Sequence, residues 1–174
     1  MPTIAGHLRR RTLPLLLALG TGIGAVLAAE TEWKEYVNAR FGFRLSYPAI
    51  LVASREPDNG GGREFHTPDK SFSLAAYAHF FVDDVDSFED RWQNELKSNG
   101  DTITYKKKTK TWYVVSGVAK DGTEYYHKLQ VNGKNWAAFD ITYPHSQHEK
   151  YDAWVERIAR SFVPFLPGDY DRLE

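Results

Sequence analysis

Two histidines, His145 and His148, are the strongest candidates for metal binding in a chain that contains no cysteine. Imidazoles three residues apart can bind one ion, and Glu149 adds a carboxylate beside them. The alternative is that Ser146 caps a helix, so that both histidines are solvated side chains whose rings need not point the same way. A metal-handling protein is therefore one interpretation, and no other cofactor is expected.

Motifs of covalent catalysis and of nucleotide binding are absent from the sequence. It has no G-x-S-x-G elbow, no P-loop, no G-x-G-x-x-G after a strand and no H-E-x-x-H. A hydrolase would need a histidine and a carboxylate in one cleft, with His66, His79 and His127 as the remaining candidates. We therefore expect a non-enzymatic protein and keep a hydrolase as an alternative.

Four lysines form a basic run in the second half of the chain: Lys106, Lys107, Lys108 and Lys110. Strand alternation places Lys106, Lys108 and Lys110 on one face, so neither face of this segment is apolar enough to be buried. An exposed edge or hairpin arm is predicted. The lysines either protect that edge against pairing with other strands or bind an acidic partner or an anionic surface.

Three other residues are candidates for binding. Phe80 and Phe81 follow a predicted strand and precede an acidic segment, which suggests an exposed apolar contact patch. The glycine-rich loop 59–62 could bind an anion through its backbone N–H groups, with the Arg63 guanidinium beside them, although a simple turn is the alternative.

Residues 1–29 have the pattern of a secretory signal peptide. Arg9, Arg10 and Arg11 precede an apolar run that ends at Ala28 and Ala29. Subtracting these three arginines from the 22 basic residues leaves 19 against 23 acidic ones, and this acidic balance argues against nucleic acid as a partner. We expect export to the periplasm or secretion, with contact to a membrane only through the signal peptide before its cleavage.

Two stretches have helical periodicity. Apolar residues recur every four positions within 86–99, where Asp86 and Glu89 have capping-box spacing. The second helix is expected over 146–162, with an apolar face of Tyr151, Trp154, Ile158 and Phe162.

The rest of the chain favours strands, expected at 33–37, 43–47, 63–67, 72–79, 102–109, 112–120, 123–131 and 136–143. Asp121-Gly122 and Asn132-Gly133 are hairpin turns that make the last three strands an antiparallel meander. The predicted class is α+β, an antiparallel sheet with helices packed on its faces. It should form a single domain over 30–165, followed by a C-terminal tail at 166–174.

The order of these elements resembles the PsbP-like fold superfamily, which includes the PsbP subunit of photosystem II, bacterial exported proteins and a Ran-binding import factor. Local matches are residues 38–43 (NARFGF) with Tyr47-Pro48, the helix at 86–96, the hairpin leading into 124–126 and residues 157–162 (RIARSF). The resemblance implies the fold and an accessory or binding role, with another protein or a small ligand as partner. It does not transfer a photosystem role, because members of one fold do unrelated jobs.

Overall fold

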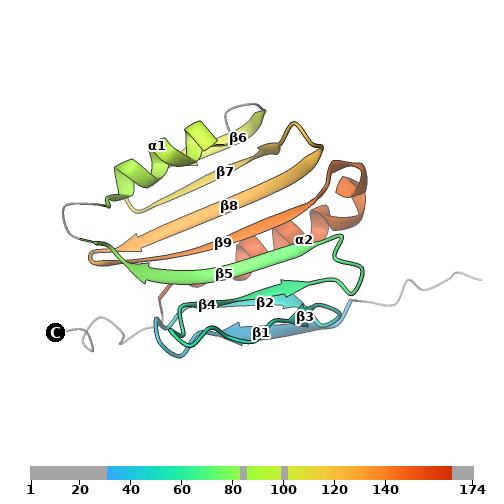
Figure 1. Cartoon of the computed structure of the whole chain (residues 1–174), viewed down its shortest axis with the longest axis horizontal. Helices are drawn as coiled ribbons and strands as arrows, with labels where there is room; N and C mark the ends of the chain where they lie inside the picture. The colour runs from blue at the N-terminus through green and yellow to red at the C-terminus, as the bar shows by residue number, and fades with distance from the viewer. Residues whose placement is uncertain (1–30, 83–85, 99–101, 166–174) are drawn as a thin grey trace, which may run out of the picture. The chain divides into compact units, whose positions relative to one another are not determined.

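The computed structural model describes residues 31–82, 86–98 and 102–165. The predicted signal peptide at 1–29 and the predicted tail at 166–174 lie outside these ranges. The described strands form two antiparallel sheets (Figure 1). The small sheet pairs β1 (Trp33–Val37) with β2 (Arg44–Pro48).

The large sheet has seven strands in the order β3-β4-β5-β9-β8-β7-β6. Their bounds are β3 (Val52–Ala53), β4 (Gly62–His66), β5 (Ser73–Phe80), β6 (Ile103–Lys108), β7 (Trp112–Val118), β8 (Thr123–Asn132) and β9 (Asn135–Pro144). The predicted α+β class is confirmed. Two features were not predicted: the two-residue strand β3, and the separation of β1 and β2 into a sheet of their own.

Helix α1 (Phe88–Ser98) begins with a different cap from the predicted one. The Ser87 hydroxyl accepts a hydrogen bond from the Asp90 N–H at 3.1 Å and donates one to the Asp90 carboxylate at 2.6 Å. Ser87 therefore caps the helix where Asp86 was expected, and Asp90 bonds to the Ser87 hydroxyl instead of to its backbone N–H as in a full capping box. Asp86 instead forms an ion pair with Arg91.

Helix α2 (His148–Ser161) follows a short 3-10 helix (His145–Gln147), so the predicted Ser146 cap is wrong. Its N-cap is Gln147, which makes no side-chain capping bond. The helix buries Tyr151, Val155 and Ile158, whereas Trp154 is only partly buried at the margin. None of the described helices is long and apolar enough to span a membrane.

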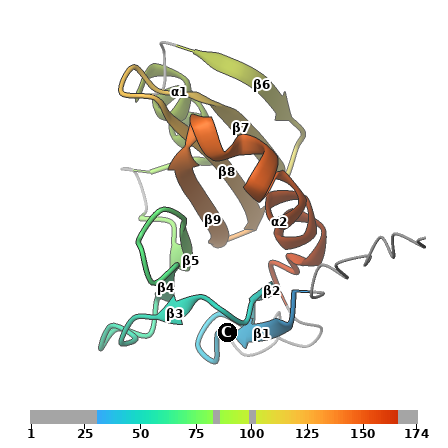
Figure 2. The same cartoon turned by 90° about the vertical axis from the view of Figure 1, so that its right-hand side faces the viewer.

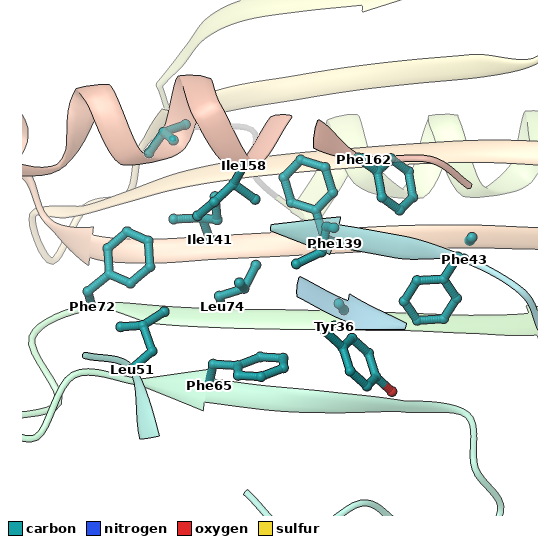
Figure 3. Close-up of a cluster of buried hydrophobic side chains, with 14 of the residues drawn as sticks. Tyr36, Phe43, Leu51, Phe65, Phe72, Leu74, Phe139, Ile141, Ile158 and Phe162 are labelled. Carbon is teal, nitrogen blue, oxygen red and sulfur yellow. The ribbon is translucent and has the colours of Figure 1, made fainter. Parts of the chain in front are cut away.

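The large sheet carries apolar side chains on both faces. Its inner face packs against α2 and the small sheet around Phe65, Phe72, Leu74, Phe139 and Ile141, all fully buried (Figure 3). Its outer face packs against α1 around a smaller group: Tyr113, Val115, Tyr125, Leu129, Trp136 and Ala138. Figure 2 shows α1 and α2 on opposite sides of the sheet.

Asn38 links the small sheet to the loop that precedes β4. Its side chain is fully buried, accepts the N–H groups of Arg40 and Phe41, and donates to the Tyr36 hydroxyl and the Gly60 carbonyl. All the hydrogen-bonding capacity of a buried amide is thereby used, which avoids the cost of an unpaired polar group.

Ile158 tests the packing of α2 on the inner face. Because it is fully buried, Ile158→Ala should lower the free energy of unfolding by about 2–5 kcal/mol. The neighbouring Glu156→Ala should cost no more than about 0.5 kcal/mol, since it removes only an exposed pair with Arg160. Urea unfolding of the two variants measures both values, and equal losses would show that the buried face of α2 is assigned wrongly.

Candidate functional site

A cleft of about 270 Å³ opens between α1 and the outer face of the sheet. We call it the α1 cleft. Its wall combines aromatic rings with charged and polar groups: Tyr77, Asp86, Arg91, Asn94, Glu95, Tyr113, His127, Leu129 and Trp136. Polar and charged groups predominate in this wall, so a ligand would be held mainly by hydrogen bonds and charge and less by apolar contact.

His127 lies at the centre of this wall because of strand register. It is directly opposite Asp140 in the β8–β9 hairpin and opposite Val115 on β7. Its Nδ1 forms a short contact with a carboxylate oxygen of Asp140. Its Nε2 lies 3.3 Å from the Tyr113 hydroxyl and 3.9 Å from a carboxylate oxygen of Glu95 on α1.

Three polar side chains, His127, Asp140 and Tyr77, contact one another in sequence across strands β8, β9 and β5. We call them the polar row. The Tyr77 hydroxyl donates a hydrogen bond to the second carboxylate oxygen of Asp140. Tyr77 lies opposite Gly62 on β4, where an added Cβ would come within 2.7 Å of the Tyr77 side chain. Only glycine leaves room for Tyr77 in this position.

Arg91 covers the other end of the α1 cleft. Its guanidinium carbon lies 3.8 Å from the centre of the Trp136 ring, and its Nε donates to Asp86 at 3.0 Å. Trp136 is only 4 % exposed, and no described residue accepts a hydrogen bond from its indole N–H. The guanidinium group therefore lies over the Trp136 ring and is paired with the Asp86 carboxylate.

The electrostatics of the α1 cleft favour a charged His127. Burial lowers its pKa, but the hydrogen bond to Asp140 and the charges of Asp140 and Glu95 outweigh burial and raise it. Burial and the nearby carboxylates also raise the pKa values of Tyr77 and Tyr113, so both hydroxyls stay neutral.

The structure brings His145 and His148 together around Glu124. Each Nδ1 lies 2.9 Å from a Glu124 oxygen, and the ring centres are 6.1 Å apart. Burial raises the pKa of Glu124, but hydrogen bonds from His145, Tyr143 and His148 outweigh it and lower that pKa. Within the described ranges, no group of three or more histidine, aspartate or glutamate side chains has the arrangement of a metal site.

Three of the four lysines, Lys106, Lys107 and Lys108, lie on β6 at the edge of the large sheet, as the sequence indicated. Lys106 and Lys107 are exposed, and Lys110 lies in the turn to β7. Lys108 instead contacts α1: its ammonium group pairs with Glu89 and lies over the rings of Phe88 and Trp92.

The predicted aromatic patch is only half present. Phe80 is 42 % exposed and packs beside Phe41, with the Arg40 guanidinium over both rings. Phe81 is partly buried, because it packs against the smaller core of the outer face. The expectation for Phe81 is therefore wrong.

The glycine-rich loop before Arg63 is a turn. The Gly60 N–H donates to the Pro57 carbonyl, and the Gly61 N–H donates to the Asn59 side chain. These two N–H groups are therefore occupied within the turn. Arg63 itself is half-buried near Tyr36 and lines a separate trough of about 590 Å³ beside Tyr77 and Asp140.

The fold that carries this site is PsbP-like. The solution structure of cyanobacterial PsbP (CyanoP) from Synechocystis is similar, with a TM-score of 0.55 and 12 % sequence identity, over 84 % of this chain and 99 % of that chain. No family model and no curated protein matches the sequence. An identity this low establishes the fold alone, and it confirms the PsbP-like fold that the sequence motifs indicated.

The charge on His127 leads to a prediction about pH. Because the folded-state pKa is raised, the stabilisation is complete below the ordinary value of 6.5 and is lost as pH rises through the folded-state pKa. The stability advantage of the wild type over His127→Gln should therefore be larger at acidic than at alkaline pH. Urea unfolding from about pH 5 to pH 9 measures it, and parallel pH profiles for the two proteins would contradict a charged His127.

Proposed function

We propose that the protein is an exported, non-enzymatic binding protein of PsbP-like fold that holds a small polar ligand in the α1 cleft. The observation that supports this most strongly is the nearly buried His127 in the wall of the α1 cleft, which is paired with the partly exposed carboxylate of Asp140. Burying the charge of His127 costs several kcal/mol before the attraction to Asp140 offsets that cost, and apolar residues of similar size often stabilise a protein as well or better. Such groups are common where a ligand must be recognised.

The groups around the α1 cleft set the chemistry of the ligand. Arg91 and His127 supply donors, the carboxylates of Glu95 and Asp86 supply acceptors, and the neutral Tyr113 hydroxyl can do either. The volume suits a molecule about the size of an amino acid or a monosaccharide. The ligand should therefore be small and should carry both donors and acceptors.

The expected signal peptide is consistent with a binding protein that acts outside the cytoplasm. The pattern of residues 1–29 predicts a signal peptide, and we propose that the mature protein acts in the periplasm or is secreted. A hydrolase and a metal-handling protein remain alternatives. The first would use His127 with Asp140, and the second would use the Nε2 atoms of His145 and His148, whose Nδ1 atoms contact Glu124.

A thermal-shift screen of the protein without residues 1–29 tests the proposal. A panel of amino acids, monosaccharides and small carboxylic acids should contain a compound that raises the melting temperature by roughly 5–10 °C at a hundredfold excess over its Kd. Glu95→Gln should reduce that shift because it removes a charge from the wall of the α1 cleft. The matched change Glu149→Gln, on the exposed start of α2, should leave it unchanged.

A panel without any stabilising compound would count against the proposal, and so would a shift that Glu95→Gln leaves intact. Catalytic turnover of a panel compound, lost in His127→Gln, would favour the hydrolase. A shift produced by zinc alone and lost in His148→Ala would favour metal handling.

A further inference from the structure

Strand β6 leaves one side of its backbone available. It is the last strand of the large sheet, and among the described residues it pairs only with β7 (Figure 1). Its residues from Thr104 to Lys107 are all exposed. An edge strand presents a row of backbone N–H and C=O groups to which another extended chain can add.

The charge of this edge is opposite to that of most of the chain after residue 29. Lys106 and Lys107 point to opposite faces of β6, because they lie opposite Val115 and Val114 of β7, and Lys110 follows in the turn. Lys108 adds its charge but is held against α1 by Glu89. An incoming strand would therefore meet ammonium groups on both of its faces.

Lysines at an edge select among partners. Two copies of β6 side by side would bring like charges together, which opposes self-association. A strand with carboxylates gains from the same lysines, because opposite charges across two strands attract and steer the encounter. Protection and selective binding are therefore compatible: the edge rejects most strands and admits acidic ones.

Two features limit where the carboxylates can lie. The register shifts between Ile103 and Tyr105, so regular pairing is available only from Tyr105 onward. A groove of about 450 Å³ beside Thr104 and Tyr105 is lined by three carboxylates, those of Glu124, Asp152 and Glu156, and Arg160 of α2 pairs with Glu156 there. Acidic residues of a partner are thus favoured at the half of the edge from Lys106 to Lys110.

We infer that β6 binds an acidic, extended segment of another protein by strand addition. Backbone hydrogen bonds to the edge supply affinity, and the lysines supply selectivity for carboxylates. This surface is separate from the α1 cleft, so it does not depend on the function proposed there.

A peptide titration tests the inference. The probe is a short, capped, fluorescently labelled peptide of alternating glutamate and threonine, added to the protein without residues 1–29. We expect saturable binding that weakens steeply between low and high salt, with the backbone amides of β6 as the main shifted NMR signals. The charge reversal Lys106→Glu with Lys107→Glu should raise the Kd about tenfold or more.

The controls separate strand addition from simple attraction. Lys34→Glu changes an exposed lysine of β1 in the small sheet and should leave the Kd within about twofold of the wild-type value. A peptide with lysine in place of glutamate, and a glutamate peptide with every second amide nitrogen methylated, should both bind at least about tenfold more weakly. Melting curves confirm that each variant is folded.

Several outcomes would overturn the inference. They are no binding of the glutamate peptide, equal binding of the methylated peptide, and equal losses in Lys34→Glu and the double variant. Binding of anionic lipid vesicles that depends on Lys106 and Lys107, without binding of the peptide, would assign the surface to a membrane instead.

Discussion

A sheet with apolar side chains on both faces needs other elements packed on each face to exclude water. In this chain the two faces are covered to different extents. The inner face receives both α2 and the small sheet, which enclose a large aromatic core. The outer face receives the 11 residues of α1, which pack chiefly near β7 through Phe88, Trp92 and Leu96. The part of the outer face that α1 does not cover carries polar side chains, and the α1 cleft lies at the edge of the covered part.

The polar row explains why the outer face can stay partly exposed to water without leaving polar groups unpaired. His127, Asp140 and Tyr77 bond to one another across three adjacent strands, so most of their polar atoms have partners inside the protein. The Asp140 side chain is still 36 % exposed, which allows water or a ligand to reach the row. A network whose polar atoms are hydrogen-bonded holds its side chains in fixed positions. A ligand then loses less free energy to ordering the site when it binds.

Much of the fold was predictable, whereas the polar row was missed for a physical reason. The Asn-Gly turn correctly predicted a β8–β9 hairpin. Its loop residues are Gly133 and Lys134, however, with Gly133 at a φ of 56°, and the strands continue to Asn132 and Asn135. Because the loop is shifted by one residue from the predicted Asn132-Gly133, each β8 residue pairs with a β9 residue two positions further along the chain. This register places His127 opposite Asp140. An aspartate within the otherwise apolar β9 was a signal in the sequence, but a partner could be assigned only once the register was known. Helix α2 shows the same limit, since periodicity alone did not distinguish buried Val155 from marginal Trp154.

The most direct test of this account is an NMR titration of the His127 ring nitrogens in uniformly labelled protein, assigned by comparison with His127→Gln. The account predicts that both nitrogens are still protonated at pH values where an ordinary histidine, with a pKa of about 6.5, has lost its proton. It also predicts that a ligand bound in the α1 cleft shifts these signals. A His127 that is neutral at pH 6, with signals insensitive to every ligand that the protein binds, would contradict it.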